Sequence, residues 1–156
     1  AWTLAPGLVR PHSRGQVLLT GNRFNDPVRV EANFLSDERD VKALLKGIEL
    51  CREIGNSAPL RPFAKRELMP GPLVGAEMLN FLRNAAGTYF HQTCTAKMGT
   101  DDLSVVDGRL RVYGIEGLRI ADGSIMPNIS TGNTMAPCVM IGQRAADMLK
   151  ADHGLS

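Results

Sequence analysis

A long amphipathic stripe between residues 36 and 55 is the feature that most constrains the fold of this chain. Apolar side chains recur there every three or four positions: Val41, Leu44, Leu45, Ile48, Cys51 and Ile54. This spacing predicts an α-helix with one buried face. Ser36 is the predicted N-cap, and Gly55 with Asn56 is the predicted end. A helix with a single apolar face must pack on another element, and we expect it to pack on a sheet.

Strand patterns precede that helix and follow it. Residues 16–20 form a short strand candidate, and residues 28–34 alternate apolar and polar side chains as a half-buried strand does. Further along, we expect a proline-rich irregular loop over 58–72, helices over 73–86 and 135–151, a hairpin around Gly108 and a strand over 118–121. These patterns predict an α+β fold in which helices cover an antiparallel sheet.

Composition excludes several classes of function. The chain has 156 residues, of which 44% are hydrophobic and 22% charged, as in ordinary globular domains. Its net charge of +2, without a basic run, does not support nucleic-acid binding. Its three cysteines show no metal-ligand spacing, and they favour a reducing, cytoplasmic location. No apolar run has the length of a membrane span. The chain opens without a methionine, as a fragment would.

Three places carry residues suited to chemistry. His91 lies in an aromatic-walled loop over 89–99, where an imidazole can act as an acid or base. Asp122-Gly123 ends a predicted strand, where a carboxylate can accept sugar hydroxyls and glycine lets a phosphate approach. Asn133 opens the last helix, whose amides favour negative charge. Each has a plain alternative: a histidine satisfied by a backbone carbonyl, a common strand-to-turn Asp-Gly, and an ordinary N-cap asparagine.

Taken in order, these motifs resemble the C-terminal part of the glucose–methanol–choline (GMC) family of flavin oxidoreductases. The resemblance is strongest over residues 87–152 and rests on several separate segments. They are Tyr89-Phe-His91, Thr95 to Gly99, Val105-Val-Asp107, Leu110 to Gly114, Gly117 to Ser124, Met126-Pro127 and Gly132-Asn-Thr-Met-Ala-Pro137. The first part is also similar to the family's substrate domain, through Pro11-His-Ser-Arg-Gly-Gln-Val17 and Leu35-Ser-Asp37.

The resemblance implies an enzyme that oxidises a small-molecule alcohol with FAD. A hydride would pass from the substrate carbon to flavin N5 while His91, at the family's active-site position, takes the hydroxyl proton. Asn133 matches the second active-site position. The residues that the resemblance places at the cofactor are Phe90, Asp122, Gly123, Asn133, Thr134 and Met135; no metal is implied.

Two departures from the family pattern bear on this interpretation. Cys94 stands where the family's His-x-x-Gly-Thr stretch usually has glycine. No Gly-x-Gly-x-x-Gly fingerprint for the ADP half of FAD occurs. We therefore expect residues 1–90 to be part of a substrate-binding domain. Residues 91–156 would carry the active-site histidine and complete a Rossmann-like FAD domain whose N-terminal half is absent. A hydroxynitrile lyase-like enzyme and a non-catalytic fragment that needs a partner half remain alternatives.

Overall fold

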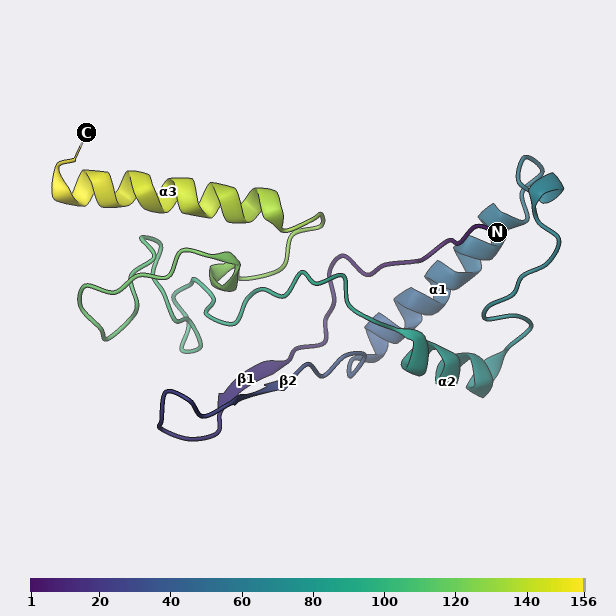
Figure 1. Ribbon diagram of the computed structural model, residues 1–156, viewed down its shortest axis with the longest axis horizontal. Helices are drawn as coiled ribbons and strands as arrows, with labels where there is room; N and C mark the ends of the chain where they lie inside the picture. The colour runs from purple at the N-terminus through teal and green to yellow at the C-terminus, as the bar shows by residue number, and fades with distance from the viewer. Residues whose placement is uncertain (156) are drawn as a thin grey trace. The chain divides into compact units, whose positions relative to one another are not determined.

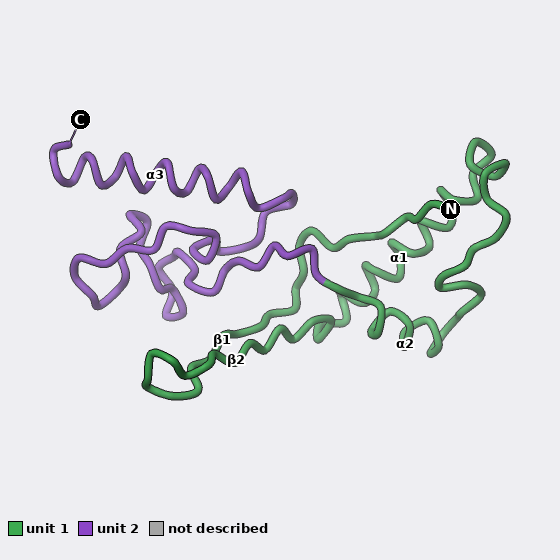
Figure 2. Tube along the Cα trace, in the orientation of Figure 1, with its two compact units in different colours: residues 1–87 green, residues 88–156 purple. Residues whose placement is uncertain are grey.

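The computed structural model describes residues 1–155 and divides the chain into two compact units, residues 1–87 and the residues from 88 onward (Figure 2). The first unit holds the strands β1 (Gln16–Leu19) and β2 (Val28–Glu31) and the helices α1 (Glu38–Gly55) and α2 (Gly75–Ala85) (Figure 1). The second holds helix α3 (Met135–His153). Short 3-10 turns lie at Arg61–Phe63, inside the proline-rich loop, and at Gly123–Ile125. The predicted α+β class is confirmed, because the chain contains both an antiparallel strand pair and α-helices.

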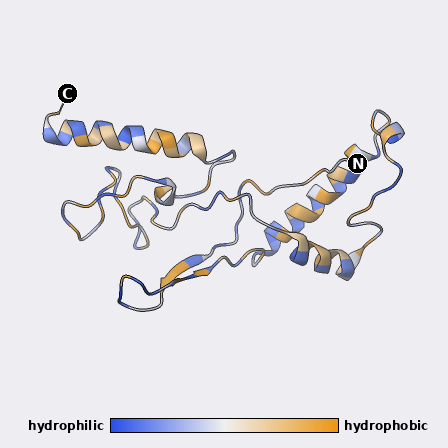
Figure 3. Cartoon of the chain, viewed as in Figure 1, coloured by the Kyte–Doolittle hydropathy of each residue, from blue (hydrophilic) through white to orange (hydrophobic). Residues whose placement is uncertain are grey.

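The sheet of the first unit is a single antiparallel hairpin. Val17 pairs with Val30 and Leu19 with Val28, so four apolar side chains share one face. They colour the hairpin hydrophobic in Figure 3, and all four are exposed. The strands are shorter than the predicted ranges. The structure therefore supports an antiparallel sheet, but within residues 1–155 no helices cover it as predicted.

Helix α1 packs mainly on α2 instead of on the hairpin. The stripe residues Val41 and Ile48 are buried together with Met78 and Leu82 of α2. This corrects the expectation that α1 packs on a sheet. The physical requirement was an apolar partner for the stripe, and the amphipathic α2 meets that requirement.

The N-terminus of α1 also differs from the prediction. Its N-cap is Asp37, not Ser36, because the Asp37 carboxylate accepts the amide of Arg39 at 2.9 Å. The Asp37 amide donates in turn to Ser13 Oγ at 3.1 Å. A bond from a distant loop thus fixes which of two neighbouring capping residues begins the helix.

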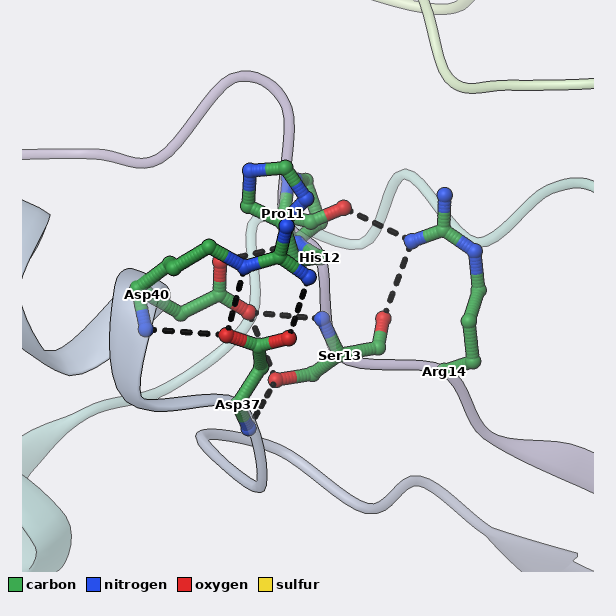
Figure 4. A network of polar contacts seen from close by, with 7 residues as sticks. Pro11, His12, Ser13, Arg14, Asp37 and Asp40 are labelled. Carbon is green, nitrogen blue, oxygen red and sulfur yellow. Dashed lines mark hydrogen bonds and ion pairs between the residues drawn. The ribbon is translucent and has the colours of Figure 1, made fainter.

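Asp40, in the first turn of α1, ties that distant loop to the helix (Figure 4). It is only 1% exposed. Its carboxylate accepts the amides of His12 at 2.8 Å and Ser13 at 2.7 Å, and the Ser13 hydroxyl at 2.6 Å. Burial raises the pKa of Asp40, but these hydrogen bonds outweigh it and the pKa is lowered. The segment that resembles the family's substrate domain thus has a structural role here.

The second unit is mostly irregular chain. Isolated β-bridges connect its segments, and these segments pack on α3. The predicted hairpin around Gly108 is present as one antiparallel bridge between Val106 and Val112, and the predicted strand over 118–121 contributes one bridge, Arg111 to Arg119. Short extended pieces suffice because their apolar side chains are buried against α3. The buried cluster of this unit consists of Val106, Leu110, Ile125 and Ala145. Among the described residues, no helix combines the length and the apolar character needed to cross a bilayer.

Candidate active site

Backbone pairing positions the segment that carries His91. The amides of Cys94, Ala96 and Met98 donate to the carbonyls of Gly123, Ser124 and Ile125 at 3.3, 2.9 and 2.7 Å. The segment after His91 therefore runs beside the Asp122-Gly123 turn. Two of the three predicted places are neighbours in space, although about 30 residues of sequence separate them.

The side chain of His91 contacts residues at the third predicted place, the start of α3. Its Nε2 lies 3.2 Å from Asn133 Oδ1, and its Nδ1 lies 3.1 Å from Thr134 Oγ1. His91 is half-buried, Asn133 is exposed, and Thr134 is buried. Both ring nitrogens thus face side chains, so the alternative of a histidine satisfied by a backbone carbonyl is wrong. The alternative for Asn133 is also wrong, because the N-cap of α3 is Thr134.

The N-terminus of α3 suits a group with negative charge. Thr134 makes no side-chain capping bond, and the first turn contains no acidic residue. Pro137 occupies the third helical position and has no amide hydrogen. The amides of Met135 and Ala136 lie in the first turn, where helix amides have no partner within the helix. These donors and the helix dipole favour a group with negative charge at this end of α3.

Asp122 and Gly123 have clear local roles. The Asp122 carboxylate accepts the Ser124 amide at 2.7 Å, and its bonds to Ser124 hold the pKa of Asp122 below the usual value. At Gly123, a Cβ atom would lie 3.1 Å from Cys138 Sγ and 3.3 Å from Thr93 Cγ2. A side chain at this position would therefore crowd Cys138 and Thr93, and glycine favours the close packing of this turn on α3.

Phe90 and Met135 flank the histidine site as large exposed apolar residues. Phe90 is 83% exposed and Met135 is 74% exposed. Phe90 has a left-handed φ of +60°, held by its amide donating to Thr88 Oγ1 at 3.0 Å. Both side chains are therefore accessible to solvent.

Two features of this site were not predicted from the sequence. Cys94 has φ +74°, in the left-handed region that favours glycine. This conformation explains why the family usually has glycine at the position that Cys94 occupies here. The contact of Thr134 with His91 was not predicted either, although a signal existed. Pro137, three residues later, removes the amide that an N-cap threonine often bonds.

Comparisons with known proteins identify the family to which this chain is similar. The family model described as GMC oxidoreductase matches residues 11–142. The chain is 44% identical over 146 residues to an oxygen-dependent choline dehydrogenase of Pseudomonas aeruginosa, covering 92% of this chain and 26% of that protein. It is 40% identical over 142 residues to an alcohol dehydrogenase [acceptor] of Pseudomonas putida, covering 89% of this chain and 26% of that protein.

Solved structures show the same fold. Pyridoxine 4-oxidase from Mesorbium loti has a TM-score of 0.84 at 33% identity, covering 89% of this chain and 28% of that chain. A formate oxidase of Aspergillus oryzae, variant R554A, has a TM-score of 0.86 at 30% identity, covering 94% of this chain and 26% of that chain. The chain thus spans about a quarter of the length of its relatives. With a family model matched over most of its length, it belongs to the GMC oxidoreductase family.

Proposed function

We propose that this chain is the C-terminal part of an FAD-dependent alcohol oxidase or dehydrogenase in which His91 takes the proton of the substrate hydroxyl. The observation that carries the proposal is the side-chain pair of His91 and Asn133, 3.2 Å apart at the N-terminus of α3. Relatives named as choline and alcohol dehydrogenases support a CH–OH donor as substrate.

The residues of this chain divide the work at the substrate oxygen. His91 takes the hydroxyl proton on an unprotonated ring nitrogen, which leaves an alkoxide and makes the adjacent carbon a better hydride donor. Asn133 holds the same oxygen through its amide and does not titrate. The uncapped start of α3 stabilises negative charge beside them.

FAD, when bound, supplies the hydride acceptor. The residues that would hold it are Phe90, Asp122, Gly123, Asn133, Thr134 and Met135. Support comes from the free donors at the start of α3 and from two relatives. One is an FAD-dependent oxidoreductase from Chaetomium thermophilum, 29% identical to this chain, and the other is the formate oxidase, whose FAD is modified.

We propose further that the rest of the FAD site comes from sequence outside these 156 residues, consistent with the quarter of its relatives' length that the chain spans. Residues 1–90 would then contribute to a substrate-binding domain. Residues 91–156 would complete a Rossmann-like FAD domain begun by an N-terminal half.

The test is His91→Ala in the full-length protein, mixed anaerobically with an alcohol while the flavin absorbance is followed. Loss of a general base reduces rates by about 10²–10⁴-fold, so flavin bleaching should slow by at least about 100-fold. His153→Ala, an exposed histidine at the far end of α3, is the matched control and should bleach normally. Near-normal bleaching in His91→Ala would refute the proposed base. Hydroxynitrile cleavage without bleaching in the unsubstituted protein would replace the oxidase assignment with a lyase.

A further inference from the structure

Three arginines converge on one carboxylate at the C-terminal end of α3. Asp152, in the last turn of the helix, accepts a hydrogen bond from Arg109 at 2.5 Å and one from Arg111 at 3.2 Å, and it forms a third ion pair with Arg119. Arg111 and Arg119 lie opposite each other in an isolated antiparallel bridge, so their side chains leave the backbone on the same side. We call Arg109, Arg111 and Arg119 the arginine cluster.

The arginine cluster carries more positive charge than the nearby carboxylates balance. Three guanidinium groups face the single carboxylate of Asp152, which leaves an excess of two positive charges. Asp107 adds one negative charge nearby, because its carboxylate accepts the amides of Arg109 and Arg111 at 2.8 and 2.9 Å, and one positive charge still remains. Like charges directly opposite each other across a bridge destabilise it. A further anion at this place would therefore relieve repulsion within the cluster.

The cluster also has hydrogen-bond donors that Asp152 does not use. A guanidinium group carries five N–H donors in a planar fork, and the three ion pairs engage only the Nη2 atom of each arginine. Arg119 Nη1 is buried and has no hydrogen-bond partner among residues 1–155. The side chains of Arg109 and Arg111 are 46% and 51% exposed, whereas that of Arg119 is 17% exposed. An anion that arrives from solvent thus meets two accessible guanidinium groups next to a third that is largely buried.

We propose that the arginine cluster is a binding site for a tetrahedral oxyanion, such as a phosphate group, and that Asp152 gathers the three guanidinium groups that form it. The fork of a guanidinium group matches two oxygens of a phosphate, and these charge-assisted hydrogen bonds are stronger than neutral ones. A phosphate group carries about 1.5 to 2 negative charges at neutral pH and presents several acceptor oxygens. It therefore offsets the excess charge of the cluster and accepts from its unused donors at the same time.

The proposed site lies far from the contact between His91 and Asn133 at the start of α3. From Met135 to Asp152 the helix rises about 1.5 Å per residue, which is about 26 Å in all. The two places thus lie at opposite ends of one helix. Oxyanion binding does not depend on the role proposed for His91, and it can be measured without turnover.

The experiment titrates the full-length protein with inorganic phosphate by isothermal titration calorimetry, in a phosphate-free buffer whose ionic strength is held constant with sodium chloride. We expect saturable binding of one phosphate per chain. Arg109→Gln and Arg111→Gln should each weaken it by about 10-fold or more, because each removes charge-assisted hydrogen bonds. Arg144→Gln, which removes an exposed arginine from the same helix, is the control and should leave the affinity unchanged.

Asp152→Asn should change the affinity in the opposite direction. Its carboxylate competes with phosphate for the same donors, so neutralising it should tighten phosphate binding by about 3- to 10-fold. Asp147→Asn removes the same charge from an exposed position of α3 and should have no effect. Ion pairs that only hold the end of the helix would give no phosphate binding in any variant. The melting temperature of each variant without phosphate identifies any that fails to fold, and Arg109→Lys, which keeps the charge but loses the fork, then replaces Arg109→Gln.

A parallel titration with phenyl phosphate separates two sources of the same chemistry. Similar affinities for the two probes indicate a site for free phosphate, and tighter binding of phenyl phosphate indicates a phosphate carried on an organic molecule. The inference is overturned by the absence of saturable binding, by equal affinities in the unsubstituted protein and the arginine variants, or by weaker binding in a folded Asp152→Asn. Binding of hexaglutamate without binding of phosphate would also overturn it and would assign the cluster to an acidic protein partner.

Discussion

Removing the Asp40 carboxylate should destabilise the first unit strongly, although Asp40 lies outside the proposed active site. The side chain is 1% exposed and accepts two amides and one hydroxyl at 2.6–2.8 Å. Each hydrogen bond to a charged group contributes about 1.5–3 kcal/mol. A plain sum would overstate the loss, because the Ser13 hydroxyl can turn to another acceptor and water can enter. We expect Asp40→Ala to lower the free energy of unfolding by about 3–5 kcal/mol.

Asp40→Asn tests the chemistry with almost no change in volume. An amide has one acceptor oxygen where the carboxylate has two, so its NH₂ group must face the amide of either His12 or Ser13. One buried donor then loses its partner, and the expected loss is about 2 kcal/mol. Asp101→Asn is the matched control. It also alters a carboxylate that accepts a backbone amide, from Leu103 at 2.9 Å, but this side chain is exposed. Its loss should be clearly smaller than that of Asp40→Asn, because solvent screens an exposed carboxylate.

Urea unfolding of the 156-residue chain, followed by circular dichroism and by fluorescence, measures these changes. Trp2 is the only tryptophan, and its ring lies 3.1 Å from the place where a Cβ of Gly55 would stand. Its emission therefore reports whether the N-terminal segment stays on α1. The reasoning fails if Asp40→Asn and Asp40→Ala both unfold within about 0.5 kcal/mol of the unsubstituted chain.

Two further predictions concern the second unit. Cys94→Gly should stabilise the chain by about 0.5–1 kcal/mol in urea unfolding, because it relieves a left-handed φ of +74°; Cys94→Ala keeps a Cβ, and an equal gain from alanine would contradict this account. At Asp152, hydrogen bonds from Arg119 and Arg111 lower the pKa to about 2 from 3.8. A lowered carboxyl pKa stabilises the fold above the usual pKa, and this is lost as pH falls from about 4 toward about 2. The melting temperatures of Asp152→Asn and the unsubstituted chain should therefore converge over that pH range, and a constant difference would argue against it.

The sequence was most informative where local interactions decide the structure. The stripe from Val41 to Ile54 predicts α1 because residues three and four apart share a helix face in any surroundings. The last helix runs from Met135 to His153, close to its predicted range. It tolerates Pro137 in its first turn because the amides there have no partner within the helix. The predicted GMC membership is likewise confirmed, because it rests on several motifs in a fixed order.

Contacts between distant segments decided what the local pattern left open. Ser36 and Asp37 are both good capping residues, and the distant Ser13 hydroxyl selects Asp37 by accepting its amide. The stripe of α1 required an apolar partner but could not specify one, and α2 took the place expected for a sheet.

The candidate site divides in the same way. The residue types of His91, Asn133 and Thr134 are evident from sequence, because imidazole, amide and hydroxyl groups have chemistry independent of the fold. That Asn133 and Thr134 hold opposite sides of one imidazole follows only from packing that brings together residues more than 40 positions apart. The left-handed backbone at Cys94 is also a tertiary result, since the amides of Cys94, Ala96 and Met98 must pair with the Gly123–Ile125 turn. Sequence determined which groups are available, and tertiary structure determined which of them meet, because burial and hydrogen bonding between segments depend on the whole chain.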